Sequence, residues 1–149
     1  MRTSNQKRPE ALARIERFLS GINYVVWLNL YGPGDSESGL ADALKSLISK
    51  DCELSGVVAC TPEQAVSQIM DRILYRGNSA SGPLQPESKA VEITRLMNTV
   101  FSSINIHDAD MVVEFGFESG HPAYPVFWDF AYDIHVAGKR WIFVGSSSD

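Results

Sequence analysis

The sequence is poor in the residues that build metal centres, disulfide frameworks and membrane spans. It has two cysteines and three histidines among 149 residues. Two cysteines are too few for a disulfide framework, and no HExxH or paired CxxC zinc motif is present. No apolar run approaches the roughly 18–20 residues that cross a bilayer, and the polar start of the chain lacks the apolar centre of a secretory signal. We therefore expect a cytoplasmic protein that uses no membrane.

Positive charge is nearly absent from the last third of the chain. Residues 1–104 carry 11 basic and 11 acidic side chains, whereas residues 105–149 carry seven acids and only two bases, Lys139 and Arg140. The formal charge of −5 therefore falls entirely in the last segment. Because nucleic-acid binders carry clustered Lys and Arg, the sequence argues against a nucleic-acid partner.

What is present is an ordinary globular composition with clear hydrophobic periodicity. The length fits a single domain over residues 1–149. Apolar residues at helical spacing predict helices over 9–19, 40–50, 62–76 and 87–104. The strongest local signal is Thr61-Pro62-Glu63-Gln64, in which Thr61 is a helix cap, Pro62 fits the first turn and Gln64 closes a capping box.

Alternating apolar and polar residues predict strands over 23–31, 54–60, 111–118, 126–136 and 140–144. The short connections near the end of the chain favour an antiparallel meander. The first strand, its helix and the second strand are expected to form a right-handed parallel crossover. The predicted fold class is α+β: a two-layer sandwich of a mixed five-stranded sheet with helices mainly on one face.

The alternation also predicts a working surface. If the all-apolar rows of the last strands, including Met111, Val113 and Phe115, meet the helices, the opposite rows combine carboxylates with aromatic rings. His121 and Tyr124 join them from a proline-rich loop at 118–125, which prolines would hold rigid. The candidate partner-binding residues are Trp27, Tyr31, Glu114, Glu118, His121, Tyr124, Phe127, Asp129, Asp133 and His135. The alternative interpretation is a solvated outer face, which is normal for an antiparallel sheet.

The first functional hypothesis is a small soluble protein-binding or inhibitor module, immunity- or antitoxin-like, that binds a basic protein through this acidic-aromatic face. Aromatic residues are enriched at interfaces, and complementary charge speeds encounter. An acidic inhibitor can also imitate the charge of a nucleic-acid substrate. This hypothesis requires no cofactor, metal or catalytic residue, and it favours a binding protein over an enzyme.

Two other functions stay open. One is a small enzyme or ligand-binding protein with a pocket around Cys60, His107 and His121, where the helix start after Cys60 would lower the pKa of its thiol. His107 and Asp110 also resemble a fragment of a metal or acid–base site, without a known spacing. The other is a homo-oligomeric subunit in which Trp27 and Phe127 pack against a second copy.

Overall fold

The computed structural model describes residues 9–20, 25–74, 86–123 and 128–148. These described residues form four α-helices, one short 3-10 helix and five strands. In order they are α1 (Glu10–Leu19), β1 (Val25–Asp35), α2 (Leu40–Leu47), β2 (Glu53–Cys60), α3 (Pro62–Ile73), α4 (Pro86–Ser103), η1 (Ile106–Asp108), β3 (Met111–Ser119), β4 (Trp128–Val136) and β5 (Lys139–Ser148).

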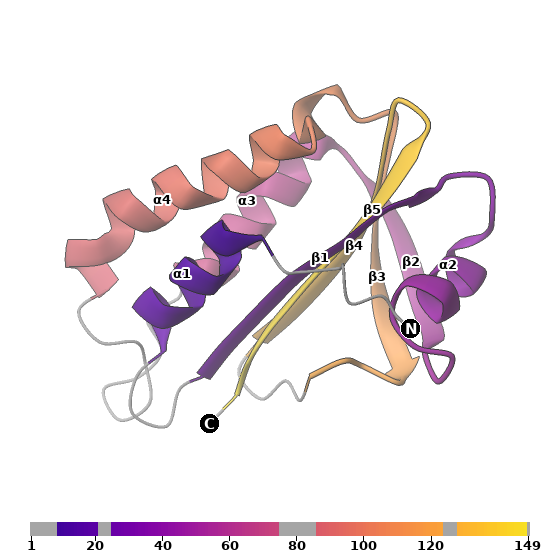
Figure 1. Cartoon of the computed structure of the whole chain (residues 1–149), viewed down its shortest axis with the longest axis horizontal. Helices are drawn as coiled ribbons and strands as arrows, with labels where there is room; N and C mark the ends of the chain where they lie inside the picture. The colour runs from indigo at the N-terminus through magenta and orange to yellow at the C-terminus, as the bar shows by residue number, and fades with distance from the viewer. Residues whose placement is uncertain (1–8, 21–24, 75–85, 124–127, 149) are drawn as a thin grey trace.

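The five strands form one sheet in the order β1-β5-β4-β3-β2. The helices α1, α3 and α4 cover one face of the sheet, and α2 alone lies on the other (Figure 1). This arrangement confirms the predicted α+β sandwich of five strands with helices mainly on one face. None of the described helices is both long and apolar enough to span a membrane.

The strand pairing differs from the prediction in one respect. All four pairings are antiparallel, so the sheet is not mixed. The expected parallel crossover between the first two strands is wrong, because β1 and β2 form opposite edges of the sheet. The last strand, β5, instead enters the sheet beside β1. Local periodicity identifies strands, but the choice of neighbours depends on contacts between distant residues.

The helices form where local signals and burial agree. In α1, Leu12, Ile15 and Leu19 make one buried face. The capping box of α3 is confirmed: Thr61 Oγ1 accepts from the Gln64 N–H at 3.0 Å, and Gln64 Oε1 accepts from the Thr61 N–H at 2.9 Å. This reciprocal pair satisfies two backbone donors at the point where β2 turns into α3.

The apolar core lies on both sides of the sheet. The larger cluster joins α1, α3 and α4 to the inner rows of β1 and β4, with Phe130 and Phe143 in edge-to-face contact at 5.1 Å between ring centroids. A smaller cluster around Leu44 of α2 includes Phe115, Ile142 and Val144. Helices on both faces therefore require apolar residues in both side-chain rows of the central strands.

This second cluster overturns the predicted orientation of β3. Val112 and Glu114 pair with Ile134 and Tyr132 and so share the α3 face, whereas Phe115 packs into the α2 cluster. The row from Met111 to Phe117 thus faces α2, and Glu114 lies on the face opposite to the one expected. The prediction failed because it assumed that only one face of the sheet was covered.

Candidate functional site

The strand β2 is an edge of the sheet that is open on one side. Within the described part of the chain it pairs with β3 alone. Its five consecutive residues from Ser55 to Ala59 are all exposed, with Val57 54% and Val58 64% accessible. An edge strand presents a row of backbone N–H and C=O groups that can pair with another strand. Exposed apolar side chains on both of its faces make β2 well suited to such pairing.

The opposite edge is protected by its sequence and its surroundings. The register between β1 and β5 shifts between Tyr31 and Gly34, and Pro33 in this segment has no N–H to donate. Helix α1 also contacts β1, and the Leu28 N–H donates to Glu16 Oε2 of that helix at 2.6 Å. A bulge, a proline and a covering helix are the usual devices that prevent an edge from pairing. The pairing of β2 also shifts, between Glu53 and Val57, but its regular part from Val57 to Cys60 has no proline.

Carboxylates surround the open edge. We call the following residues, which lie on or next to β2 and β3, the acidic border: Asp51, Glu53, Glu63, Asp110, Glu114 and Glu118. Residues 51–71 and 105–138 contain no Lys or Arg. Lys50 precedes the border at one end of β2 and is the nearest cation along the chain. No ion pair joins the border to any other residue that the structure describes.

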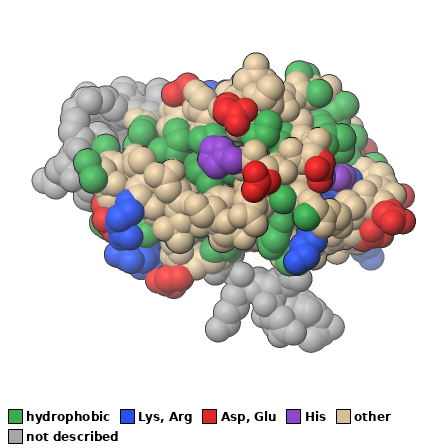
Figure 2. Space-filling view, turned by 90° about the horizontal axis from the view of Figure 1, so that it is seen from above, with side chains coloured by type: hydrophobic (Ala, Val, Ile, Leu, Met, Phe, Trp, Pro, Cys, Tyr) green, Lys and Arg blue, Asp and Glu red, His purple; other side chains and the backbone are tan. Residues whose placement is uncertain are grey.

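The acidic character extends over one end of the molecule. Figure 2 looks onto the end that is uppermost in Figure 1, where β2 finishes, α3 begins and η1 leads into β3. Asp and Glu side chains gather across this view around the histidines, and most Lys and Arg side chains lie at its margins. Asp108 and Asp110, both exposed, belong to this end. A partner approaching this end meets the exposed carboxylates of Asp108 and Asp110.

A groove of about 350 Å³ opens beside the edge on the α2 face of the sheet. Its apolar walls come from Leu40, Val57, Met111 and Val113. Its floor and far wall are polar and consist of Ser36, Ser38, Gly39, Asp133, His135 and Arg140. The groove therefore runs across the sheet from the exposed strand β2 to the loop that joins β1 to α2.

The floor of the groove is a closed polar network. Arg140 Nε donates to Asp133 Oδ1 at 2.9 Å, and both residues are only 2% exposed. Arg140 Nη1 donates to the Ser38 carbonyl at 2.9 Å, which fastens the loop before α2 to β5. His135 Nε2 lies 3.1 Å from Asp133 Oδ2. Because these groups already pair with one another, the network anchors the loop rather than leaving a free charge.

The structure divides the predicted partner-binding residues among several environments. Trp27 and Tyr31 do lie on the α2 face, but they pack against the α2 cluster. Asp133 is buried in its ion pair rather than solvent-facing, and Glu114 lies on the other face. Asp129 and Glu118 are exposed, and the His135 side chain is 12% exposed at the groove. Tyr124 and Phe127 lie outside the described residues. The predicted continuous acidic-aromatic face is therefore not formed.

His121 follows the C-terminal end of β3, and its ring packs against neighbouring residues. Its ring makes an edge contact with Phe117 at 4.9 Å between centroids, and its Nδ1 accepts from the Ala123 N–H at 2.9 Å. Its buried Nε2 has no hydrogen-bond partner among the described residues, with Asp129 Oδ2 3.8 Å away. Burial lowers the pKa of His121, against the opposing effects of the Asp129 carboxylate and the Ala123 backbone.

The residues of the enzyme hypothesis are not brought to one pocket. Cys60 and His107 belong to the end of the sheet where β3 begins, whereas His121 follows its other end, about 25 Å along a nine-residue strand. Burial raises the pKa of the Cys60 thiol, and Glu114 raises it further. The expected activation of this thiol by the start of α3 is therefore wrong. In the described residues no three His, Cys, Asp or Glu side chains are grouped to hold a metal ion.

Burial also governs Tyr132, which faces α3 beside this edge. Its hydroxyl donates to Gln68 Oε1 of α3. Burial raises the pKa of Tyr132, and the neighbouring Glu114 and Cys60 raise it further. This side chain is a neutral hydrogen-bond donor that fastens α3 to the centre of the sheet.

Comparisons with known proteins inform the fold alone. The sequence matches no protein-family model and no curated protein. Among solved structures, the crystal structure of citrus MAF1 is similar, with a TM-score of 0.50 over 93% of this chain and 98% of that chain, at 9% sequence identity. An identity this low indicates a shared arrangement of helices and strands and carries no function across.

Sequence reasoning missed the two features that matter most here. The segment with Val57 and Val58 was predicted as a strand, but its place at an exposed edge was not, because a strand's own residues do not determine which strands flank it. Arg140 was visible as one of only two bases in the acidic last segment. That isolation was a usable signal, since a lone base among carboxylates is readily drawn into an ion pair.

Proposed function

We propose that the protein is a protein-binding module, of the inhibitor kind expected from the sequence, which captures a basic partner at the open edge of β2. The observation that carries the proposal is the exposure of five consecutive residues, Ser55 to Ala59, on an edge strand with no second neighbour in the described chain. In strand addition, backbone hydrogen bonds provide affinity and side-chain contacts provide specificity.

Apolar burial and charge both favour this mode of binding. Val57 and Val58 are a little more than half exposed, so covering them contributes roughly 1 kcal/mol each. The acidic border provides a field that attracts Lys and Arg and raises the rate of encounter. The proposed surface retains the basic partner of the sequence hypothesis but moves it from the face of the sheet to its edge.

The same charges disfavour pairing between two copies of this chain. Edge-to-edge association through β2 would bring two acidic borders together, and like charges on neighbouring strands are destabilising. The homo-oligomeric alternative is thus weaker at this edge than capture of a basic chain. An immunity- or antitoxin-like role is the specific form of the proposal, in which the basic partner is an enzyme held inactive by the added strand.

The proposal is tested by affinity capture from the native host with the wild-type protein and the variant Val58→Lys. Lysine on an edge strand opposes pairing and also repels a basic partner. Val58 is 64% exposed, so the variant is expected to fold normally. Val91→Lys is the matched control, since Val91 is 83% exposed on α4, away from the edge.

We expect a partner with a basic extended segment that the wild-type protein and Val91→Lys retain and Val58→Lys loses. Hydrogen exchange of the purified complex should show slowed exchange of the β2 amides. Protection confined to β1 or to the helices would contradict the proposal. So would the absence of any partner whose retention depends on Val58.

A further inference from the structure

The groove beside β2 opens next to the proposed binding edge. We infer that it is an anchor site for an apolar side chain of the added strand, so that the partner segment alternates apolar residues with Lys or Arg. This inference rests on the proposed function and specifies the partner that the same edge selects.

Strand geometry determines which side chains of an added strand reach the groove. Successive side chains of a strand point to opposite faces of a sheet. Val57 and Ala59 pair with Phe115 and Val113 and so face α2, whereas Val58 pairs with Glu114 and faces α3. Every second residue of an added strand therefore continues the row of Val57 and lies at the mouth of the groove.

The groove is suited to an apolar side chain rather than a charged one. Leu40, Val57, Met111 and Val113 form its walls, and Met111 is 45% exposed. All three nitrogens of Arg140 already donate, Nε and Nη2 to Asp133 and Nη1 to Ser38. A charged ligand group would find no free counter-charge in this floor, whereas an apolar one would cover the exposed walls.

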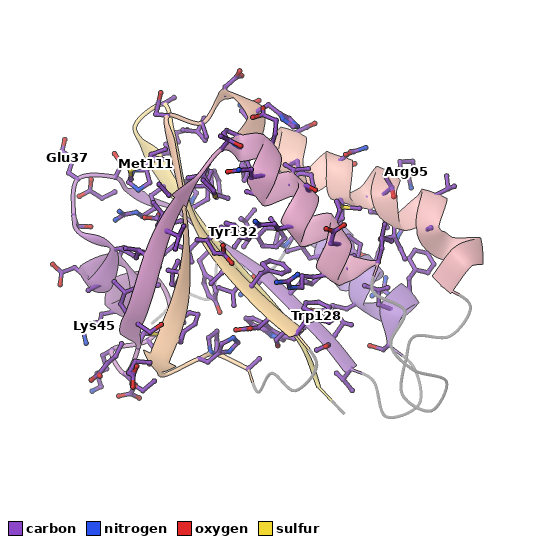
Figure 3. The ribbon with its side chains drawn as sticks, turned by 180° about the vertical axis from the view of Figure 1, so that it is seen from behind. Glu37, Lys45, Arg95, Met111, Trp128 and Tyr132 are labelled. Atoms are coloured by element: carbon purple, nitrogen blue, oxygen red, sulfur yellow. The ribbon has the colours of Figure 1, made fainter. Side chains whose placement is uncertain are left out.

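The other row of the added strand meets carboxylates. On the α3 face, the position beside Val58 neighbours Glu114, and Glu63 lies exposed where α3 begins. Figure 3 shows Tyr132, which pairs with Glu114, near the middle of the sheet, whereas the cation Arg95 lies on α4, on the far side of the molecule from Met111. A side chain that alternates with the apolar anchor is therefore best matched when it is Lys or Arg, since charge complementarity sets register and partner choice.

The test uses synthetic peptides as probes, with binding to the full chain measured by fluorescence anisotropy. One peptide alternates Leu with Lys, and a second alternates Ser with Lys to keep the charge while removing the anchor. A third has the composition of the first but groups its leucines at one end. We expect the alternating Leu–Lys peptide to bind roughly tenfold or more tightly than either of the others, as expected for burial of an apolar side chain.

Variants separate the anchor from the edge. Met111→Asn, at the exposed wall of the groove, removes an apolar side chain without adding charge, so it should weaken the Leu–Lys peptide roughly tenfold and leave the Ser–Lys peptide almost unchanged. Val58→Lys should weaken both peptides. Val91→Lys is the control and should change neither.

The outcomes distinguish failure of the anchor site from failure of the proposed binding edge on which it rests. Equal binding of the Leu–Lys and Ser–Lys peptides, or no effect of Met111→Asn, would overturn the anchor site while Val58→Lys still tests the edge. If Val58→Lys changes neither peptide, the proposed function itself is wrong. A concentration-dependent dimer that Val58→Lys abolishes would show that a second copy of this chain occupies the edge, and it would overturn both.

Discussion

Arg140 of β5 and Asp133 of β4 form a two-point ion pair in which both partners are almost completely buried. Arg140 Nε lies 2.9 Å from Asp133 Oδ1, and Nη2 lies 3.3 Å from Oδ2. The pair joins neighbouring strands, and through Ser38 it also fixes the loop before α2. The floor of the groove and the position of α2 thus depend on the same guanidinium.

Removing one partner of this pair should be costly. Asp133→Leu or Arg140→Met alone leaves a buried charge unpaired, and each should lower the free energy of unfolding by roughly 3–5 kcal/mol. The double variant removes both charges and should lose much less than the sum of the two. Urea unfolding followed by circular dichroism measures all three. Strictly additive losses would show that the two side chains do not stabilise each other.

The capping box should contribute measurably to α3. Thr61→Ala removes the hydroxyl that accepts from the Gln64 N–H, and it should lower the free energy of unfolding by about 1 kcal/mol. Thr61 is exposed, so little packing is lost with it. Thr99→Ala is a suitable control, because Thr99 is exposed within α4 and donates only to the preceding turn. Equal losses in the two variants would argue against a specific cap.

His121 should make stability depend on pH. Its pKa is lower in the folded protein than in the unfolded chain, so the unfolded chain binds more protons as the pH falls below about 6.5. The stabilisation from neutral His121 is complete above that pH and is lost as the pH falls through the lower folded pKa. Urea unfolding between pH 7.5 and 5 (about the physiological histidine range) should show a steeper decline for the wild type than for His121→Asn. Parallel curves would contradict this assignment.

Cys60 should be an unreactive thiol. Because burial and Glu114 raise its pKa, the thiolate fraction at neutral pH is smaller than that of an ordinary cysteine. In a Cys52→Ser background, alkylation by iodoacetamide should be slower than that of a free model thiol. Glu114→Gln should accelerate it, because it removes a nearby negative charge. Alkylation faster than the model thiol would revive the nucleophile hypothesis.

Local patterns predicted the helices well because the signals that indicate a helix lie within a short stretch of sequence. The spacing of Leu12, Ile15 and Leu19 and the Thr61–Gln64 box require no knowledge of the rest of the chain. The alternation of β4 was equally informative, since it placed Trp128 and Phe130 in the larger core and Asp129 on the opposite face.

The candidate site depended on distant contacts and could not be predicted in the same way. Asp133 lies in the expected row. It is buried as the ion-pair partner of Arg140 only because the fold brings Arg140 and the loop at Ser38 next to it. The rows of β3 were assigned to the wrong faces because α2 covers the second side of the sheet. The open edge at Val58 follows from strand order, which the sequence leaves undetermined.

The position of β5 between β1 and β4 has a consequence for synthesis of the chain. Trp27 pairs with Ser146, roughly 120 residues later, and such distant pairings slow folding. Among the described strands, β1 pairs with β5 alone, so on the ribosome it stays unpaired until β5 has emerged from the exit tunnel. The apolar side chains of β1 therefore lack their partner strand while all the residues between β1 and β5 are synthesised.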